Sequence, residues 1–141
     1  MSSSLRVDEF ENKTDQELNL ALAELTGEFT PIPEGYTSEY AGNTLYAVDP
    51  LRNMEACHPD YTDNWEQLMA LSIEHGAFVS PLAWERSPKK YRAKYIALNE
   101  FGKMMTFGTK YMSDDDDPAR ALAMTLIKIL RSKNDETNTT D

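Results

Sequence analysis

The chain has 141 residues and a formal net charge of −10 at pH 7, because 24 Asp and Glu side chains outnumber 14 Lys and Arg. This length suits a single domain, and an apolar content of 40% excludes a wholly disordered chain, a collagen and a disulfide scaffold. The acidic balance argues against a protein that coats DNA, and a single cysteine, Cys57, excludes an internal disulfide and a multi-thiolate metal site.

The first predicted element is a helix over residues 15–26. Thr14 and Glu17 stand at capping-box spacing, where each side chain can bond the backbone N–H of the other. Leucines and alanines follow at helical intervals, and Gly27 can adopt the left-handed conformation that ends a helix. Residues 1–13 carry little apolar periodicity, so we expect a flexible N-terminus there.

The segment 28–42 is predicted to be a long, ordered loop. Its prolines and glycines deny it a regular helix and most ladder hydrogen bonds. Residues 45–48 follow as a short β-prone run that Asp49 and Pro50 stop, and we expect an edge or isolated strand there. Another irregular stretch leads to the next helix.

That helix is predicted over residues 63–75. Several residues at its start are competing N-caps, and Asp63 and Glu66 stand at capping-box spacing. Trp65 and Leu68 begin an apolar stripe that we expect in the core, and a glycine ends the element.

Three β-prone segments come next, and they predict an antiparallel meander over 77–85, 91–99 and 103–112. Side chains alternate along a strand, so the odd-numbered residues of the middle strand share one face and the even-numbered residues share the other. Neither face is cleanly apolar, and we expect both sides to be partly covered.

The last predicted element is a helix over residues 118–131. Residues 114–117 are four aspartates, and an Asp followed by Pro118 is a strong helix start. Leu122 and Leu126 belong to the apolar stripe of this helix and are expected in the core. The run suggests Ca²⁺, but it lacks the alternation and the glycine of an EF-hand loop, so we interpret it as a solvated acidic cap.

Together these elements predict an α+β fold, in which an antiparallel sheet of three to four strands is sandwiched by α-helices. The single domain is expected over residues 14–131. Residues 132–141 are polar throughout, and we expect them to form a disordered tail.

Two joints between the predicted elements have distinctive residues. They are Pro59 to Trp65 (PDYTDNW), which lead into the middle helix, and Asp117 to Leu122 (DPARAL), which open the last one. With the element order, these joints resemble the phage ABA-sandwich domain family, small proteins encoded by tailed phages and prophages. The resemblance covers most of 14–131 and implies an α/β/α sandwich of phage or prophage origin, with no catalytic residue or ligand to carry over.

The sequence contains no motif for catalysis or a cofactor. Cys57, His58 and Asp60 lie close together, but a zinc site needs three or four tetrahedral ligands and no second pair is present, so we interpret this segment as an exposed loop. A nucleophile elbow, a phosphate-binding loop and a dinucleotide fingerprint are absent. We therefore expect a non-enzymatic protein without a cofactor or a metal.

The charge distribution is the most informative feature. Residues 81–112 contain seven Lys and Arg against two Glu, inside an otherwise acidic protein. Interleaved basic and aromatic side chains have the composition of a surface for phosphates and bases; in the simpler alternative, the cations pair with the protein's own acidic residues. The candidate interaction residues are Trp84, Arg86, Lys89, Lys90, Tyr91, Arg92, Lys94 and Tyr95.

The acidic excess supports the opposite hypothesis, in which carboxylates on residues 8–74 mimic DNA and inhibit a host defence nuclease. Ordinary solubility is the simpler explanation of these charges. We expect a phage-encoded accessory protein that acts in the cytoplasm of the bacterial host by binding another protein, such as a host defence protein, or a second copy of itself. Weak nucleic-acid binding through 86–94 is an alternative, but strong duplex binding is not expected. No apolar run has the length of a membrane helix.

Overall fold

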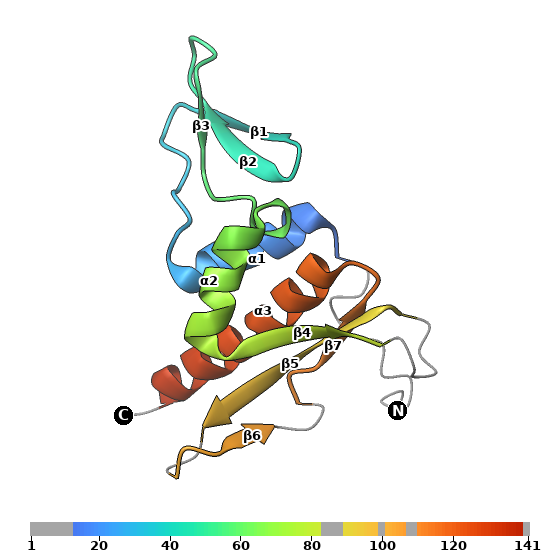
Figure 1. Cartoon of the computed structure of the whole chain (residues 1–141). Coiled ribbons are helices and arrows are strands. Elements are labelled where there is room, and N and C mark those ends of the chain that lie inside the picture. Colours follow the sequence, from blue (N-terminus) through green and yellow to red (C-terminus); the bar gives the residue numbers. More distant parts are fainter. Residues whose placement is uncertain (1–12, 83–88, 99–100, 107–109, 140–141) are drawn as a thin grey trace, which may run out of the picture.

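The computed structural model describes residues 13–82, 89–98, 101–106 and 110–139 (Figure 1). The described residues form three α-helices, a three-stranded sheet and a four-stranded sheet. The α+β class is therefore confirmed, and sheets and helices pack as the layers of a sandwich. The helices are α1 (Asp15–Thr26), α2 (Trp65–His75) and α3 (Pro118–Thr139), and a short 3-10 helix, η2 (Tyr61–Asp63), precedes α2.

The smaller sheet has the antiparallel order β1-β2-β3, with β1 at Thr37–Ala41, β2 at Thr44–Val48 and β3 at Met54–Ala56. The prediction of a loop over 28–42 is wrong for β1, and β2 is the central strand rather than an edge or isolated one. The reason is a two-residue turn: Gly42 has a φ of 62°, which suits the first position of a hairpin turn and folds β1 back on β2.

The larger sheet contains β4 (Ala77–Pro81), β5 (Tyr91–Leu98), β6 (Met104–Thr106) and β7 (Ser113–Asp115). β4 and β7 pair with the same part of β5, so they lie on opposite edges of it. The predicted meander is confirmed over 77–81, 91–98 and 104–106 and is wrong at Leu82, which is not in a strand. The predicted strand residues 83–85, 99 and 107–109 lie outside the described residues. The third predicted strand is wrong over 110–112, which are not in a strand, and β7 comes from the start of the aspartate run.

Helix α3 is the centre of the fold. The residues from Ala121 to Ile127 are all fully buried, because strands of the larger sheet cover one side of α3 while α1 and α2 pack on others (Figure 1). A helix that is buried all round in this way carries apolar side chains on every face. The helix ends at Thr139 rather than at 131, so the expected disorder is wrong for residues 132–139.

The other two helices begin and end at local signals. The capping box of α1 is confirmed: the N–H of Glu17 donates to Thr14 Oγ1 at 3.2 Å, and the N–H of Thr14 donates to Glu17 Oε1 at 2.9 Å. In α2 the N-cap is Asn64 rather than Asp63, and its side chain accepts from the N–H of Gln67. Leu68 is buried, but Trp65 is 47% exposed, so its predicted place in the core is wrong. It lies in the first turn of α2, where its ring is only partly covered.

Candidate protein interface

Of the basic and aromatic side chains predicted to share one surface, the four that belong to β5 lie on two faces of the strand. Ala93 is fully buried, and Tyr91 and Tyr95 pack against the core that α3 dominates. The ring of Tyr95 meets that of Tyr111 edge-on, with centroids 5.1 Å apart. Tyr91 and Tyr95 therefore do not form a surface on which bases stack, and this part of the predicted patch is wrong. Strand alternation is the cause.

The cations of the patch have different surroundings. Arg92 lies opposite Asp114 and binds both carboxylate oxygens, at 2.8 and 2.9 Å. The backbone N–H of Lys90 donates to Asp116 at 3.2 Å. Lys94 lies opposite Phe78 on the face turned away from α3, and Lys89 precedes β5. Trp84 and Arg86 lie outside the described residues. Arg92 therefore follows the simpler alternative, in which the cation pairs with an acidic residue of the protein itself.

The aspartate run is built into the fold, so its interpretation as a solvated run is wrong for Asp114 and Asp115. Asp115 accepts from Arg120 Nε at 3.2 Å, and Arg120 also pairs with Asp15 of α1. Burial by itself lowers the pKa of Arg120, but its hydrogen bonds to the two aspartates outweigh burial and raise that pKa. Asp117 accepts from the N–H of Ala119 at 2.9 Å, which confirms its capping role.

The segment around Cys57 and His58 is not the exposed loop that we predicted. Both side chains are buried. His58 Nε2 accepts from the N–H of Leu45 at 3.2 Å, and Nδ1 lies 2.8 Å from the carbonyl of Pro59, so one neutral tautomer satisfies both contacts. Burial raises the pKa of the Cys57 thiol, which makes it a poorer nucleophile and ligand. Across the described ranges, no three His, Cys, Asp or Glu residues gather to hold a metal.

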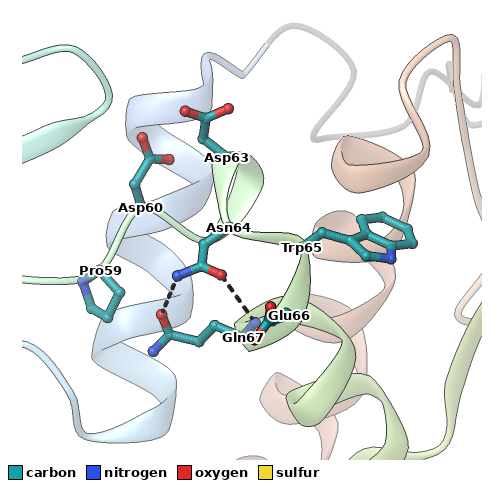
Figure 2. Close-up of a pocket in the computed structure, with 7 residues that line it drawn as sticks. All are labelled: Pro59, Asp60, Asp63, Asn64, Trp65, Glu66 and Gln67. Carbon is teal, nitrogen blue, oxygen red and sulfur yellow. Dashed lines mark hydrogen bonds between the residues drawn. The ribbon is translucent and has the colours of Figure 1, made fainter.

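An open pocket of about 600 Å³ lies where η2 leads into α2 (Figure 2). Asn64 and Gln67 are tied together by the cap and by a side-chain contact of 3.4 Å. The carboxylates of the pocket make its charge negative, and no described Lys, Arg, His, Ser or Cys lines it. The lining residues are Pro59, Asp60, Asp63, Asn64, Trp65, Glu66 and Gln67.

The pocket belongs to a larger acidic surface, which we call the acidic half: β1 to β3, α1, η2 and α2. Between residues 13 and 82 the only basic residues apart from histidine are Lys13 and Arg52, and Arg52 pairs with Glu39 at 3.3 Å. Five exposed carboxylates form neither an ion pair nor a side-chain hydrogen bond with any described residue. They are Glu24, Glu34, Glu55, Asp63 and Glu66. The excess of acidic residues in this part of the sequence was the signal for this surface.

No family model, no curated protein and no solved structure matches this chain. The resemblance to the phage ABA-sandwich family therefore stays a prediction. Within the residues that the structure describes, no helix is long and apolar enough to cross a membrane.

Proposed function

We propose that this protein is a non-enzymatic binding protein, and that its acidic half docks on a basic surface of another protein. The observation that carries the proposal is the contrast between the two halves. Five exposed carboxylates of the acidic half have no ion-pair partner among the described residues, whereas Arg92 of the larger sheet is neutralised by Asp114.

The physical argument concerns both rate and specificity. Uncompensated charge of one sign attracts a surface of the opposite sign over several ångströms and raises the association rate. Rim charges of this kind select the partner, while affinity comes from the contacts that they surround. A pocket with an amide pair, carboxylates and a half-exposed Trp65 supplies such contacts for Lys and Arg side chains.

A second candidate is an acidic mimic of DNA that blocks a nucleic-acid-binding protein, such as a host defence nuclease. The same carboxylates support it, and the partner's basic groove would then be its DNA site. On the resemblance alone, we propose a phage or prophage origin and a partner in the cytoplasm of the bacterial host cell.

The test is affinity capture from bacterial lysate with two matched variants. One neutralises the five exposed carboxylates (Glu24→Gln, Glu34→Gln, Glu55→Gln, Asp63→Asn and Glu66→Gln). The other keeps every charge (Glu24→Asp, Glu34→Asp, Glu55→Asp, Asp63→Glu and Glu66→Asp). We expect the charge-preserving variant to retain the partner and the neutralised variant to lose it. Equal capture by both variants would overturn the proposal, and release of the partner by duplex DNA would favour the DNA-mimic candidate.

A further inference from the structure

The smaller sheet projects from the body of the molecule and is anchored at one end (Figure 1). Its β1–β2 turn is held by α1, since Gln16 Nε2 donates to the carbonyl of Gly42 at 2.8 Å and Asn19 Nδ2 lies 3.4 Å from that of Asn43. Of the described helices and strands outside this sheet, only α1 packs against it, through β2. The sheet is therefore a projection that α1 holds at the β1–β2 turn, and β1 is one of its two edge strands.

Strand β1 has an edge that no other described strand covers. It stands at the end of the β1-β2-β3 order, it pairs with β2 alone among the described strands, and all five of its residues are exposed. No described residue forms a backbone hydrogen bond with its outer side. The strand pairs with β2 in one unbroken register of five residues. Its one charged residue is Glu39, and it contains no proline, lysine or bulge of the kind that protects sheet edges.

The peptide groups that point outward can be identified. Leu45, opposite Tyr40, directs its backbone away from β1: its N–H donates to His58, and its carbonyl accepts from Cys57 at 2.8 Å. Tyr40 and Leu45 are therefore a non-hydrogen-bonded pair, and by alternation so is Ser38 with its partner. The N–H and C=O groups of Ser38 and Tyr40 face this edge, spaced for a further antiparallel or parallel strand.

We propose that β1 is a docking edge for an extended segment of the partner protein, added to the sheet as a fourth strand. This inference rests on the proposed function and specifies the element that makes the contact. Backbone bonds to Ser38 and Tyr40 would supply affinity, and alternate side chains of the segment would supply specificity. Tyr40, 42% exposed, offers an apolar neighbour on one face, and Glu39, which also pairs with Arg52, offers a carboxylate on the other.

The charges around β1 indicate which kind of segment would pair with its edge. Residues 28–60 contain six Asp and Glu and one Arg, so a segment that alternates basic and apolar side chains fits this edge. A second copy of the chain fits less well. Full antiparallel overlap of two β1 strands would place Glu39 opposite Glu39 of the second copy, and like charges directly opposite each other are destabilising.

The test uses the whole protein labelled with ¹⁵N and the peptide Lys-Val-Lys-Val-Lys-Val-Lys, with Glu-Val-Glu-Val-Glu-Val-Glu as the acidic control. Amide hydrogen exchange at Ser38 and Tyr40 should be fast in the free protein and slow by at least about tenfold with the basic peptide. The acidic peptide should have no effect. Exchange that is unchanged at both amides, or slowed equally by both peptides, would overturn the proposal.

Matched variants separate edge binding from general charge attraction. Ser38→Pro removes an outward N–H without touching the ladder to β2, because proline is tolerated on edge strands where the N–H faces solvent. It should abolish protection of Tyr40, while Ser38→Ala should retain it, and unchanged amide spectra of α3 report that both variants are folded. If Ser38→Pro still binds the peptide at β1, the edge proposal fails. The proposed function has its own test: it fails if the variant with the five neutralised carboxylates still captures the partner protein.

Discussion

Arg92 and Asp114 face each other across β5 and β7, and the guanidinium contacts both oxygens of the carboxylate, with Nε–Oδ1 at 2.8 Å and Nη2–Oδ2 at 2.9 Å. Both side chains are largely buried, at 21% and 25% exposure. The pair holds the start of the aspartate run against the sheet. A cation that the composition assigned to an external partner therefore stabilises the protein's own fold.

Removing this pair should destabilise the protein. Asp114→Ala leaves Arg92 partly buried without its bidentate partner, and charge-assisted hydrogen bonds of this kind contribute about 1 to 2 kcal/mol. Urea denaturation should report a loss of that size in the free energy of unfolding. Asp135→Ala, at an exposed position, should change it by less than about 0.5 kcal/mol. Equal losses in the two variants would contradict the structural role of the pair.

The glycines that end α1 and α2 give a matched comparison. Gly27 and Gly76 both have left-handed φ values, 79° and 82°, but a Cβ on Gly27 meets nothing within 4 Å, whereas one on Gly76 would lie 2.4 Å from the carbonyl oxygen of Ile96. Gly27→Ala should cost about 1 kcal/mol, from backbone strain alone. Gly76→Ala should cost at least about 2 kcal/mol more, since β5 must shift. Thermal melts of both variants would measure the difference, and equal melting temperatures would contradict the close approach.

Asn19 fixes the position of η2 from the inside of the protein. Its Oδ1 accepts from the N–H of Thr62 at 3.0 Å, its Nδ2 donates to Asp60 at 2.8 Å, and the residue is fully buried. Asn19→Leu keeps the volume but leaves the N–H of Thr62 without its partner and removes one of the hydrogen bonds to Asp60, so we expect a loss of about 2 to 3 kcal/mol in urea denaturation. Gln16→Leu, which removes an exposed bond, should lose less than about 1 kcal/mol. A larger loss in Gln16→Leu would reverse this interpretation.

His75 gives the stability a pH dependence of known sign. Burial, followed by the positive charge of Lys133, lowers the pKa of His75 from its ordinary value of 6.5, although Glu74 acts in the opposite direction. Below that value the unfolded chain takes up the proton more readily than the folded protein does, so stability is lost as the pH falls through the folded pKa. Above it both states are neutral at this site. His75→Gln should therefore lose less stability than the parent between about pH 7.5 and 5.5, and an equal loss would contradict the shift.

The parts of the fold that depend on neighbouring residues were predictable. The bounds of α1 match the prediction because its capping box and its terminal glycine are local signals. Strand β1 was missed because Pro31 and Pro33 dominate the segment, although both precede the strand. The signal for it was the glycine and asparagine that stand between β-prone residues, a common hairpin turn.

The candidate protein interface was harder to predict from the sequence, because it depends on pairing between distant residues. The alternation of β5 was enough to place Tyr95 and Arg92 on opposite faces, even though their composition grouped them together. The bond between Arg92 and Asp114 joins residues 22 positions apart, and no local pattern identifies it. A strand made of aspartates also runs against β-propensity, so tertiary contacts decide its structure.

The last prediction concerns nucleic acid. With Arg92 paired and Tyr91 and Tyr95 packed on the core, the other described basic residues of β5 and its approach are Lys89, Lys90 and Lys94. One aromatic side chain, Phe78, lies directly opposite Lys94 on the same face. The Debye length of about 8 Å at physiological salt confines the attraction of these lysines to nearby phosphates, while the acidic half repels duplex DNA. We expect the affinity for labelled duplex and single-stranded DNA to be weaker than about 1 μM in fluorescence anisotropy at physiological salt. Sub-micromolar binding with a steep salt dependence, lost in Lys90→Ala/Lys94→Ala, would assign the outer face of the larger sheet to nucleic acid and contradict the protein-binding function proposed above.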